Sequence, residues 1–414
     1  MVLAGLIGRL PMGMVGLGLT LMVVGVSSSY ALASAVAATS TVSLALVGPR
    51  VSRVVDRVGQ TKALPRILAV HTAALLLLTA SVTLGLPEPL WFLFAAIAGA
   101  SIPNLGAMTR SRWVRISRNG AERSSAFAME SVVDEMVFVM GPVLASALAL
   151  AFFPAAPVLV AMAAALIGGL WLASQRSTAP PPAGTAPAHL EDGNSAKRSP
   201  LRFPGLVWVF FLMLAMGAVF GSLNVSIVAF AQETAPAMTG FMLAALSLGS
   251  LLSGLVLGAM TRTWTLTGQV RSGLVTLTLA LTPLVAMAVL GIPALFAVMA
   301  FFAGLSVSVV MVGAFGLAER LVPNRRLTES LSIMASGLSL GMAVALPSAG
   351  LLIDHVGTPA AMALSAGFAT VGALMFWVRS PAIRRLEEAS DSREAAEVDE
   401  DEERALSRTA PSPQ

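Results

Sequence analysis

Three carboxylates, Glu130, Asp134 and Glu135, stand in the otherwise apolar stretch "AMESVVDEMVFVMGPVL" at residues 128–144. No Lys or Arg falls within this stretch. A carboxyl group that is buried without a counter-charge can take up and release a proton near neutral pH. The stretch is therefore a candidate site for proton binding if its surroundings are apolar.

Other reactive centres are absent from the sequence. The chain has no cysteine, which excludes a disulfide framework and a thiolate metal site. Its histidines, His71, His189 and His355, are far apart, and it has no HExxH motif, phosphate-binding loop or serine nucleophile elbow. We therefore expect no enzyme activity, no metal site and no cofactor.

The composition is that of a protein in lipid. Charged residues make up 12% of the chain and hydrophobic residues 56%, whereas a soluble domain is about a quarter charged. The mean hydropathy is +0.82. The net charge of +4 does not indicate a nucleic-acid partner, because the positive residues are spread over separate loops. The sequence thus predicts an integral membrane protein whose surrounding partner is the lipid bilayer.

The apolar runs predict twelve membrane spans. A bilayer core of about 30 Å requires about 20 apolar residues per helix, and we find twelve such runs, the first from residue 10 and the fifth from Ser125. With the N-terminus inside, all 26 Lys and Arg fall in cytoplasmic segments, as the positive-inside rule requires. Arg9 belongs to the first of these segments. Both termini are thus predicted to be cytoplasmic.

A linker divides the predicted spans into two sets of six. A Pro-rich, charged segment at 174–204 is typical of a cytoplasmic linker. It separates a six-helix bundle at 1–173 from a second one at 205–380. The acidic segment 381–414 has almost no aromatic residues, so we expect a disordered cytoplasmic tail.

The two sets of spans also resemble each other. "SRVVDRVGQTK" at 52–62 aligns without gaps with "TRTWTLTGQVR" at 261–271, at the same point of each half. Duplicated six-helix halves with a binding site between them, near the middle of the membrane, are a plan of secondary transporters. The predicted fold is an all-α membrane protein with twelve transmembrane helices in two pseudo-symmetric six-helix bundles.

The loop after the second span resembles the signature loop of the major facilitator superfamily. Asp56, Arg57 and Gly59 match its Asp-Arg/Lys-x-Gly pattern, while Gln60 and Thr61 stand where the superfamily has two basic residues. An Asp at a helix end can pair with an arginine of the other half, and a glycine permits the tight turn. We interpret Asp56, Arg57 and Gly59 as parts of a cytoplasmic gate, although a merely charged inner loop would also satisfy the topology.

A second resemblance lies in the fifth span, where Gly141 and Pro142 are similar to the end of a helix-packing motif of drug exporters. The resemblance implies alternating access and proton antiport, with export of small hydrophobic or amphipathic compounds. It implies a monomer in the inner membrane of a bacterium. Two alternatives stay open: nutrient uptake or uniport by the same fold, and a non-transporting sensor or scaffold that signals through its tail.

The three carboxylates are expected to differ in role. If the fifth span begins at Ser125, Asp134 and Glu135 lie about 14 to 15 Å deep, where no counter-ion is predicted, so both are candidates for proton coupling and Asp134 is the first. Glu130 is also a coupling candidate. We favour for it a structural ion pair with Arg110 or Arg112.

Five other residues are candidates for lining the substrate cavity. They are polar residues within predicted spans: Asn104, Asn224, Ser222, Tyr30 and His71. Serine hydroxyls in helices often bond only their own backbone. A buried histidine is more often a neutral, hydrogen-bonded residue than a titrating one.

Overall fold

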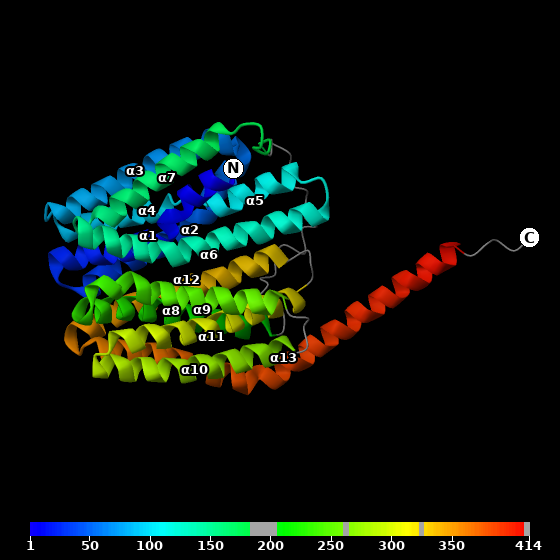
Figure 1. Cartoon of the computed structure of the whole chain (residues 1–414). Coiled ribbons are helices and arrows are strands. Elements are labelled where there is room, and N and C mark those ends of the chain that lie inside the picture. The colour runs from blue at the N-terminus through cyan, green and yellow to red at the C-terminus, as the bar shows by residue number, and fades with distance from the viewer. Residues whose placement is uncertain (183–204, 260–264, 323–326, 410–414) are drawn as a thin grey trace, which may run out of the picture.

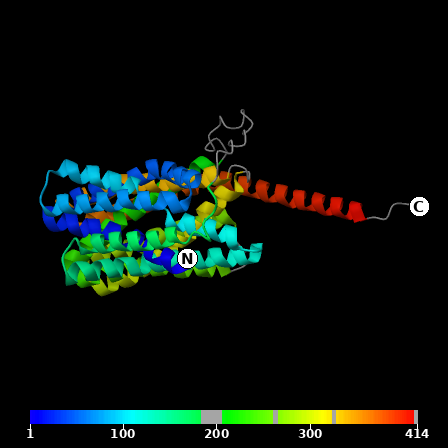
Figure 2. The same cartoon turned by 90° about the horizontal axis from the view of Figure 1, so that it is seen from above.

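The computed structural model is all-helical, and its helices run side by side in both views (Figures 1 and 2). It describes residues 1–182, 205–259, 265–322 and 327–409. Within these described ranges, twelve helical segments are long and apolar enough to span a membrane, which confirms the predicted fold class. Their helices are α1 (Val2–Ser27), α2 (Tyr30–Val58), α3 (Gln60–Thr83), α4 (Glu88–Ala100), α5 (Leu105–Ile116), α6 (Gly120–Ala151), α7 (Ala156–Ser174), α8 (Leu206–Thr234), η2 (Pro236–Met238), α9 (Thr239–Ala259), α10 (Leu266–Leu290), α11 (Pro293–Arg320), α12 (Leu327–His355) and α13 (Thr358–Thr409).

The helices form two halves, α1–α7 and α8–α13, which meet where α2 packs on α12 and α6 packs on α9. We call the end at which α1 turns into α2 the hairpin end (left in Figure 1) and the opposite end the linker end. A buried apolar cluster joins the halves in the part of the bundle nearer the hairpin end. It includes Ala38 of α2, Ala229 of α8 and Ile353 of α12.

Corresponding helices pack alike in the two halves. A Cβ placed on Gly99 of α4 would lie 2.1 Å from the backbone oxygen of Ser40 in α2. The equivalent Cβ on Gly304 of α11 would lie 2.0 Å from the backbone oxygen of Leu246 in α9. In both places only glycine allows the two helix backbones to come this close.

The repeated loop sequence gives a second matching contact. The side-chain amide of Gln60 donates to the backbone oxygen of Met108 at 3.3 Å. The amide of Gln269, its counterpart in the aligned loop, donates to the backbone oxygen of Val309 at 3.1 Å. The two halves are therefore pseudo-symmetric down to individual hydrogen bonds.

The fourth span is interrupted between α4 and α5, around Pro103. Side chains hydrogen-bond to backbone groups on both sides of the interruption. His71 Nδ1 donates to the backbone oxygen of Ala98 at 3.0 Å, and Asn104 accepts from the backbone N–H of Ala107 at 3.1 Å. Non-helical backbone at membrane depth requires such partners, because lipid offers none.

The first helix begins at Val2, earlier than the predicted start at residue 10. Arg9 therefore lies inside the first span and not in a cytoplasmic segment ahead of it. At 1.5 Å per residue, it is about 10 Å from the start of the helix. This shift adds one positive charge, that of Arg9, to the membrane-spanning part of the first half.

The segment expected to be a disordered tail begins as part of the second half. α13 continues to Thr409, and within it Ile383 and Glu387 are buried. The Glu387 carboxylate accepts the backbone N–H groups of Leu266 at 2.6 Å and Thr267 at 3.1 Å, at the start of α10. The sequence there is rich in Ala, Glu and Arg, which favour helix. The predicted linker begins directly after α7, and its residues 183–204 lie outside the described part of the chain.

Candidate functional site

The arginine within α1 is paired with acids of α6. Arg9 and Glu130 are each 1% exposed and form an ion pair through Arg9 Nη2 and Glu130 Oε2. Arg9 Nη1 also donates to Asp134 Oδ1 at 2.9 Å. Arg9 Nη2 further contacts the hydroxyl of Thr109 in α5. One guanidinium group thus connects α1, α5 and α6.

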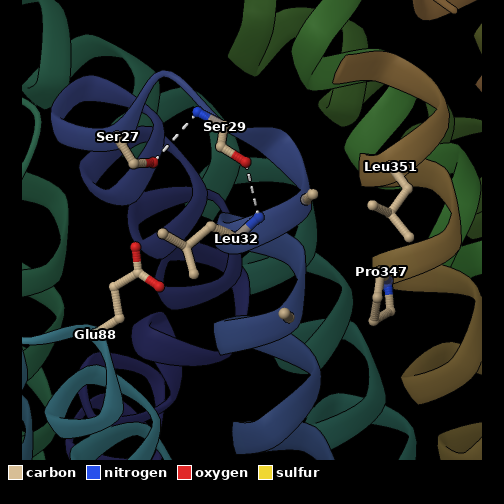
Figure 3. A pocket seen from close by; sticks show the side chains of 8 residues that line it. Ser27, Ser29, Leu32, Glu88, Pro347 and Leu351 are labelled. Carbon is tan, nitrogen blue, oxygen red and sulfur yellow. Dashed lines mark hydrogen bonds between the residues drawn. The ribbon is translucent and has the colours of Figure 1, made fainter. Parts of the chain in front are cut away.

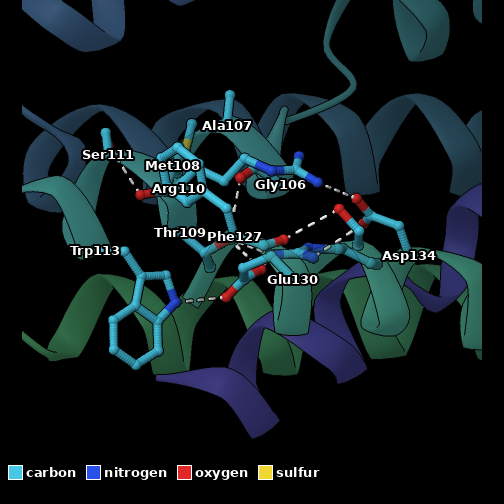
Figure 4. Close-up of polar contacts among 12 residues, drawn as sticks. Gly106, Ala107, Met108, Thr109, Arg110, Ser111, Trp113, Phe127, Glu130 and Asp134 are labelled. Atoms are coloured by element: carbon cyan, nitrogen blue, oxygen red, sulfur yellow. Dashed lines mark hydrogen bonds and ion pairs between the residues drawn. The ribbon is translucent and has the colours of Figure 1, made fainter. Parts of the chain in front are cut away.

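The α5 side chains complete this arrangement (Figure 4). Arg110 Nη2 donates to Asp134 Oδ2 at 2.7 Å. The Trp113 indole N–H donates to Glu130 Oε1 at 2.8 Å, and Thr109 donates to Glu130 Oε2 at 2.8 Å. Arg110 is 35% exposed and Asp134 23%, so this end of the arrangement is accessible while the Arg9–Glu130 end is not.

We call Arg9, Arg110, Glu130 and Asp134 the charge cluster. It holds two guanidinium groups and two carboxylates, so its formal charge is zero. Buried charges are tolerated when they are paired and hydrogen-bonded, and removing one partner of such a pair is strongly destabilising. The cluster can therefore keep four charged side chains inside the first half.

The prediction that Asp134 has no counter-ion is wrong. It depended on a first span that begins after Arg9, whereas α1 carries Arg9 to the level of Asp134. The expected partners of Glu130 are also corrected. Arg110 pairs with Asp134, and Arg112 donates elsewhere, to Gln60 Oε1 at 2.8 Å and to the backbone oxygen of Gln175 at 2.9 Å.

Glu135 has no hydrogen bond or ion pair with any residue that the structure describes, and it is only partly buried. It points about 100° away from Asp134 around the helix axis and only about 20° away from Pro142, two turns along. The backbone oxygen of Pro142 lies 2.5 Å from a Cβ placed on Gly240 of α9. Glu135 therefore lies on the face of α6 that meets the second half.

The other cavity candidates lie apart from the charge cluster. Ser222 is fully buried and binds its own helix and Ser365 of α13, at 2.8 Å. Asn224 donates to the backbone oxygen of Phe220 in its own helix, at 2.8 Å. Tyr30 begins α2 at the hairpin end.

His71 and Asn104 flank the interruption of the fourth span, where both make structural hydrogen bonds. The Asn104 side chain is exposed there, in the same span as Arg110. Of the five cavity candidates, Asn104 is the closest in sequence to Arg110 of the charge cluster.

The signature-loop residues lie at the linker end. Gly59 has φ of +90°, a conformation that glycine adopts readily, and it stands between α2 and α3. Asp56 and Arg57 are exposed. Residues 323–326, between α11 and α12 in the sequence, lie outside the described residues.

The glycine of the helix-packing motif touches α1. A Cβ placed on Gly141 would lie 2.6 Å from the Cα of Gly13. Gly141 and Gly13 therefore bring α6 and α1 into backbone contact, about one turn from Arg9 and about two turns from Asp134 along their helices. The next residue, Pro142, contacts α9, so this short motif touches both halves.

Sequence reasoning did not predict three members of the site: Arg9, Thr109 and Trp113. The predicted topology places Arg9 in the cytoplasmic segment before the first span, and Thr109 and Trp113 in the one after the fourth span. One signal was available, because "GRLPMG" places Arg9 within an apolar run that starts at the second residue. Helical spacing also puts Trp113 one turn after Thr109.

The part of the chain that the structure describes has the fold of a multi-pass membrane protein, with twelve candidate membrane spans. Residues 209–410 match the family model of the Major Facilitator Superfamily. No curated protein matches the chain in sequence.

Solved transporters share the fold over nearly the whole chain. A nucleoside transporter has a TM-score of 0.70 at 16% identity, covering 91% of this chain and 98% of its own. A bacterial homologue of the iron transporter ferroportin, in an inward-facing state, has a TM-score of 0.69 at 14% identity, with 92% and 97% covered. A D-xylose-proton symporter has a TM-score of 0.68 at 14% identity, with 91% and 96% covered. At such low identities the likeness shows the fold alone.

Proposed function

We propose that the whole chain is a facilitator-type secondary transporter that exports small hydrophobic or amphipathic compounds in exchange for protons. It works by alternating access as a monomer in the inner membrane of a bacterium, with the linker end in the cytoplasm. The observation that supports this most is Glu135, an acid without a described partner on the face of α6 that meets the second half. Arg9 lies within the first span, and the predicted placement of every other Lys and Arg on one side supports the orientation.

The charge cluster favours Glu135 over Asp134 as the proton carrier. Protonating Asp134 would remove one of the two negative charges of the cluster and leave it with a net positive charge. It would also weaken the ion pairs that Asp134 forms with Arg9 and Arg110. Protonating Glu135 neutralises a charge that has no such partner. Uncompensated charge is costly in a low-dielectric interior. We therefore place proton binding on Glu135 and assign the Asp134–Arg110 pair to holding α5 against α6.

The exchange cycle follows from this placement. In the structure the halves pack on each other near the hairpin end, so cargo would reach the site from the linker end. Glu135 would release its proton to the cytoplasm as cargo binds. After the linker end closes, a proton from outside would return to Glu135 as cargo leaves. Asp56 and Arg57 would contact the second half in that closed state.

A transport assay tests the proposed function. Everted membrane vesicles that contain the protein are energised with a pH gradient, and proton efflux is recorded as compounds are added one at a time. We expect amphipathic compounds to dissipate the gradient only in vesicles that contain the protein. If none of a broad library does so, while some compounds cross without proton movement, uniport or uptake replaces the proposal.

The tail distinguishes a transporter from a signalling scaffold. We expect a chain ending at Ala389 to keep its stability and transport, because Glu387, which binds the start of α10, and Leu386, which lies beside Gly205, both remain. A chain ending at Ile383 should instead unfold at a lower temperature, since the N–H groups at the start of α10 lose their acceptor. Thermal unfolding measures the stability of each shortened chain, and the vesicle assay measures its transport. Loss of transport with unchanged stability in the longer chain would favour a role of the tail itself.

A further inference from the structure

The carboxylate of Asp354 joins the two halves at the hairpin end. Asp354 lies near the end of α12, and its oxygens accept hydrogen bonds from the first residues of α2 in the other half. The donors are the backbone N–H of Tyr30 at 2.8 Å, the backbone N–H of Ala31 at 2.9 Å and the Ser29 hydroxyl at 2.7 Å. The first N–H groups of a helix lack helical acceptors, and the helix dipole favours a negative charge there.

The backbones are in contact beside these hydrogen bonds. A Cβ placed on Gly350, one turn before Asp354, would lie 2.4 Å from the backbone oxygen of Tyr30. It would also lie 2.7 Å from the Ser34 hydroxyl. The start of α2 is thus held both by the carboxylate and by a close approach that glycine allows.

An open pocket of about 440 Å³ lies beside this contact, lined by Ser29, Leu32 and Glu88 from the first half and by Pro347 and Leu351 from the second (Figure 3). The hydrogen bonds of Asp354 therefore act at this end together with the buried apolar cluster that includes Ala38 and Ile353.

We propose that Asp354 is a positioning residue of the transport cycle, which holds the hairpin end closed by binding the start of α2. Opening of this end breaks its three hydrogen bonds, and water replaces them. The inference rests on the proposed alternating access, but it uses residues far from Glu135 and the charge cluster. It assigns part of the energetic cost of opening to one exposed carboxylate that water can reach.

Distances between the halves test this directly. Because the chain has no cysteine, spin labels can be attached to a Val26→Cys, Val356→Cys pair, whose two positions are exposed at the hairpin end on opposite halves. Distances are measured in lipid nanodiscs without any substrate. We expect Asp354→Ala to shift the ratio of long to short distances about fivefold, comparable to loss of a helix cap. Glu88→Gln, at an exposed acid of the same end, should leave the ratio unchanged.

A second label pair controls for local distortion. Arg115→Cys and Glu319→Cys lie at the linker end on opposite halves, and their separation should shorten as the hairpin end opens. Ser29→Ala should produce a smaller shift in the same direction, which provides a test if Asp354→Ala does not fold. Unchanged distances at both ends would overturn the proposal. The readout involves no protons or cargo, so failure of proton coupling at Glu135 would not affect it.

Discussion

Replacement of Arg9 by Leu should destabilise the protein by about 3–5 kcal/mol, as expected when one partner of a buried ion pair is removed. Glu130 is 1% exposed and would lose the guanidinium that pairs with it. Asp134 would keep Arg110 alone. Thermal unfolding in detergent should show the loss, and transport should disappear with it.

A compensating change separates lost charge balance from lost packing. Arg9→Leu combined with Glu130→Gln removes one positive and one negative charge, so we expect it to recover part of the stability that Arg9→Leu alone loses. Arg50→Gln is the matched control. Arg50 is exposed, and its guanidinium donates to a backbone oxygen of its own helix. Equal effects of Arg9→Leu and Arg50→Gln would contradict the assignment of Arg9 to a buried ion pair.

Replacement of Glu135 by Gln should abolish transport driven by a pH gradient while leaving the fold intact. The amide has nearly the shape of the acid but cannot exchange a proton. We expect gradient-driven accumulation of a transported compound in everted vesicles to fall at least about 100-fold, roughly the contribution of a positioned proton-transfer group. Exchange of labelled for unlabelled compound without a gradient should continue, because it needs no proton.

Two variants control this prediction. Glu319→Gln removes an exposed carboxylate at the end of α11 and should keep full coupling. Asp134→Asn should lower stability, since Arg9 and Arg110 both lose charge complementarity, but should retain proton movement per molecule transported. Uncoupled transport in Asp134→Asn together with full coupling in Glu135→Gln would reverse the roles of the two acids.

The spans and the duplication could be predicted from the sequence because they depend on local properties. Apolar runs of sufficient length and the placement of positive residues in alternate loops define the helices without reference to their packing. The aligned loops around Gln60 and Gln269 reflect the same repeat, and the structure places both in equivalent hydrogen bonds. These features require no knowledge of which helices are neighbours.

The site could not be predicted in the same way, because it depends on which helices touch. Arg9 is tolerable inside a span only because Thr109, Glu130 and Asp134 lie against it, more than ninety residues away in the chain. Seen alone, an arginine near the N-terminus marks the end of an apolar run. The same limitation applies to Glu387, whose acceptor role becomes apparent only when α13 is packed beside α10.

Proton release on binding is the most direct test of the central claim that cargo and proton exchange at Glu135. Purified protein in weakly buffered detergent solution is mixed with a compound identified by the vesicle screen, and the pH change is recorded with a soluble indicator. The proposal predicts proton release from the unaltered protein and from Glu319→Gln, and none from Glu135→Gln that still binds the compound. Undiminished proton release from Glu135→Gln would contradict it.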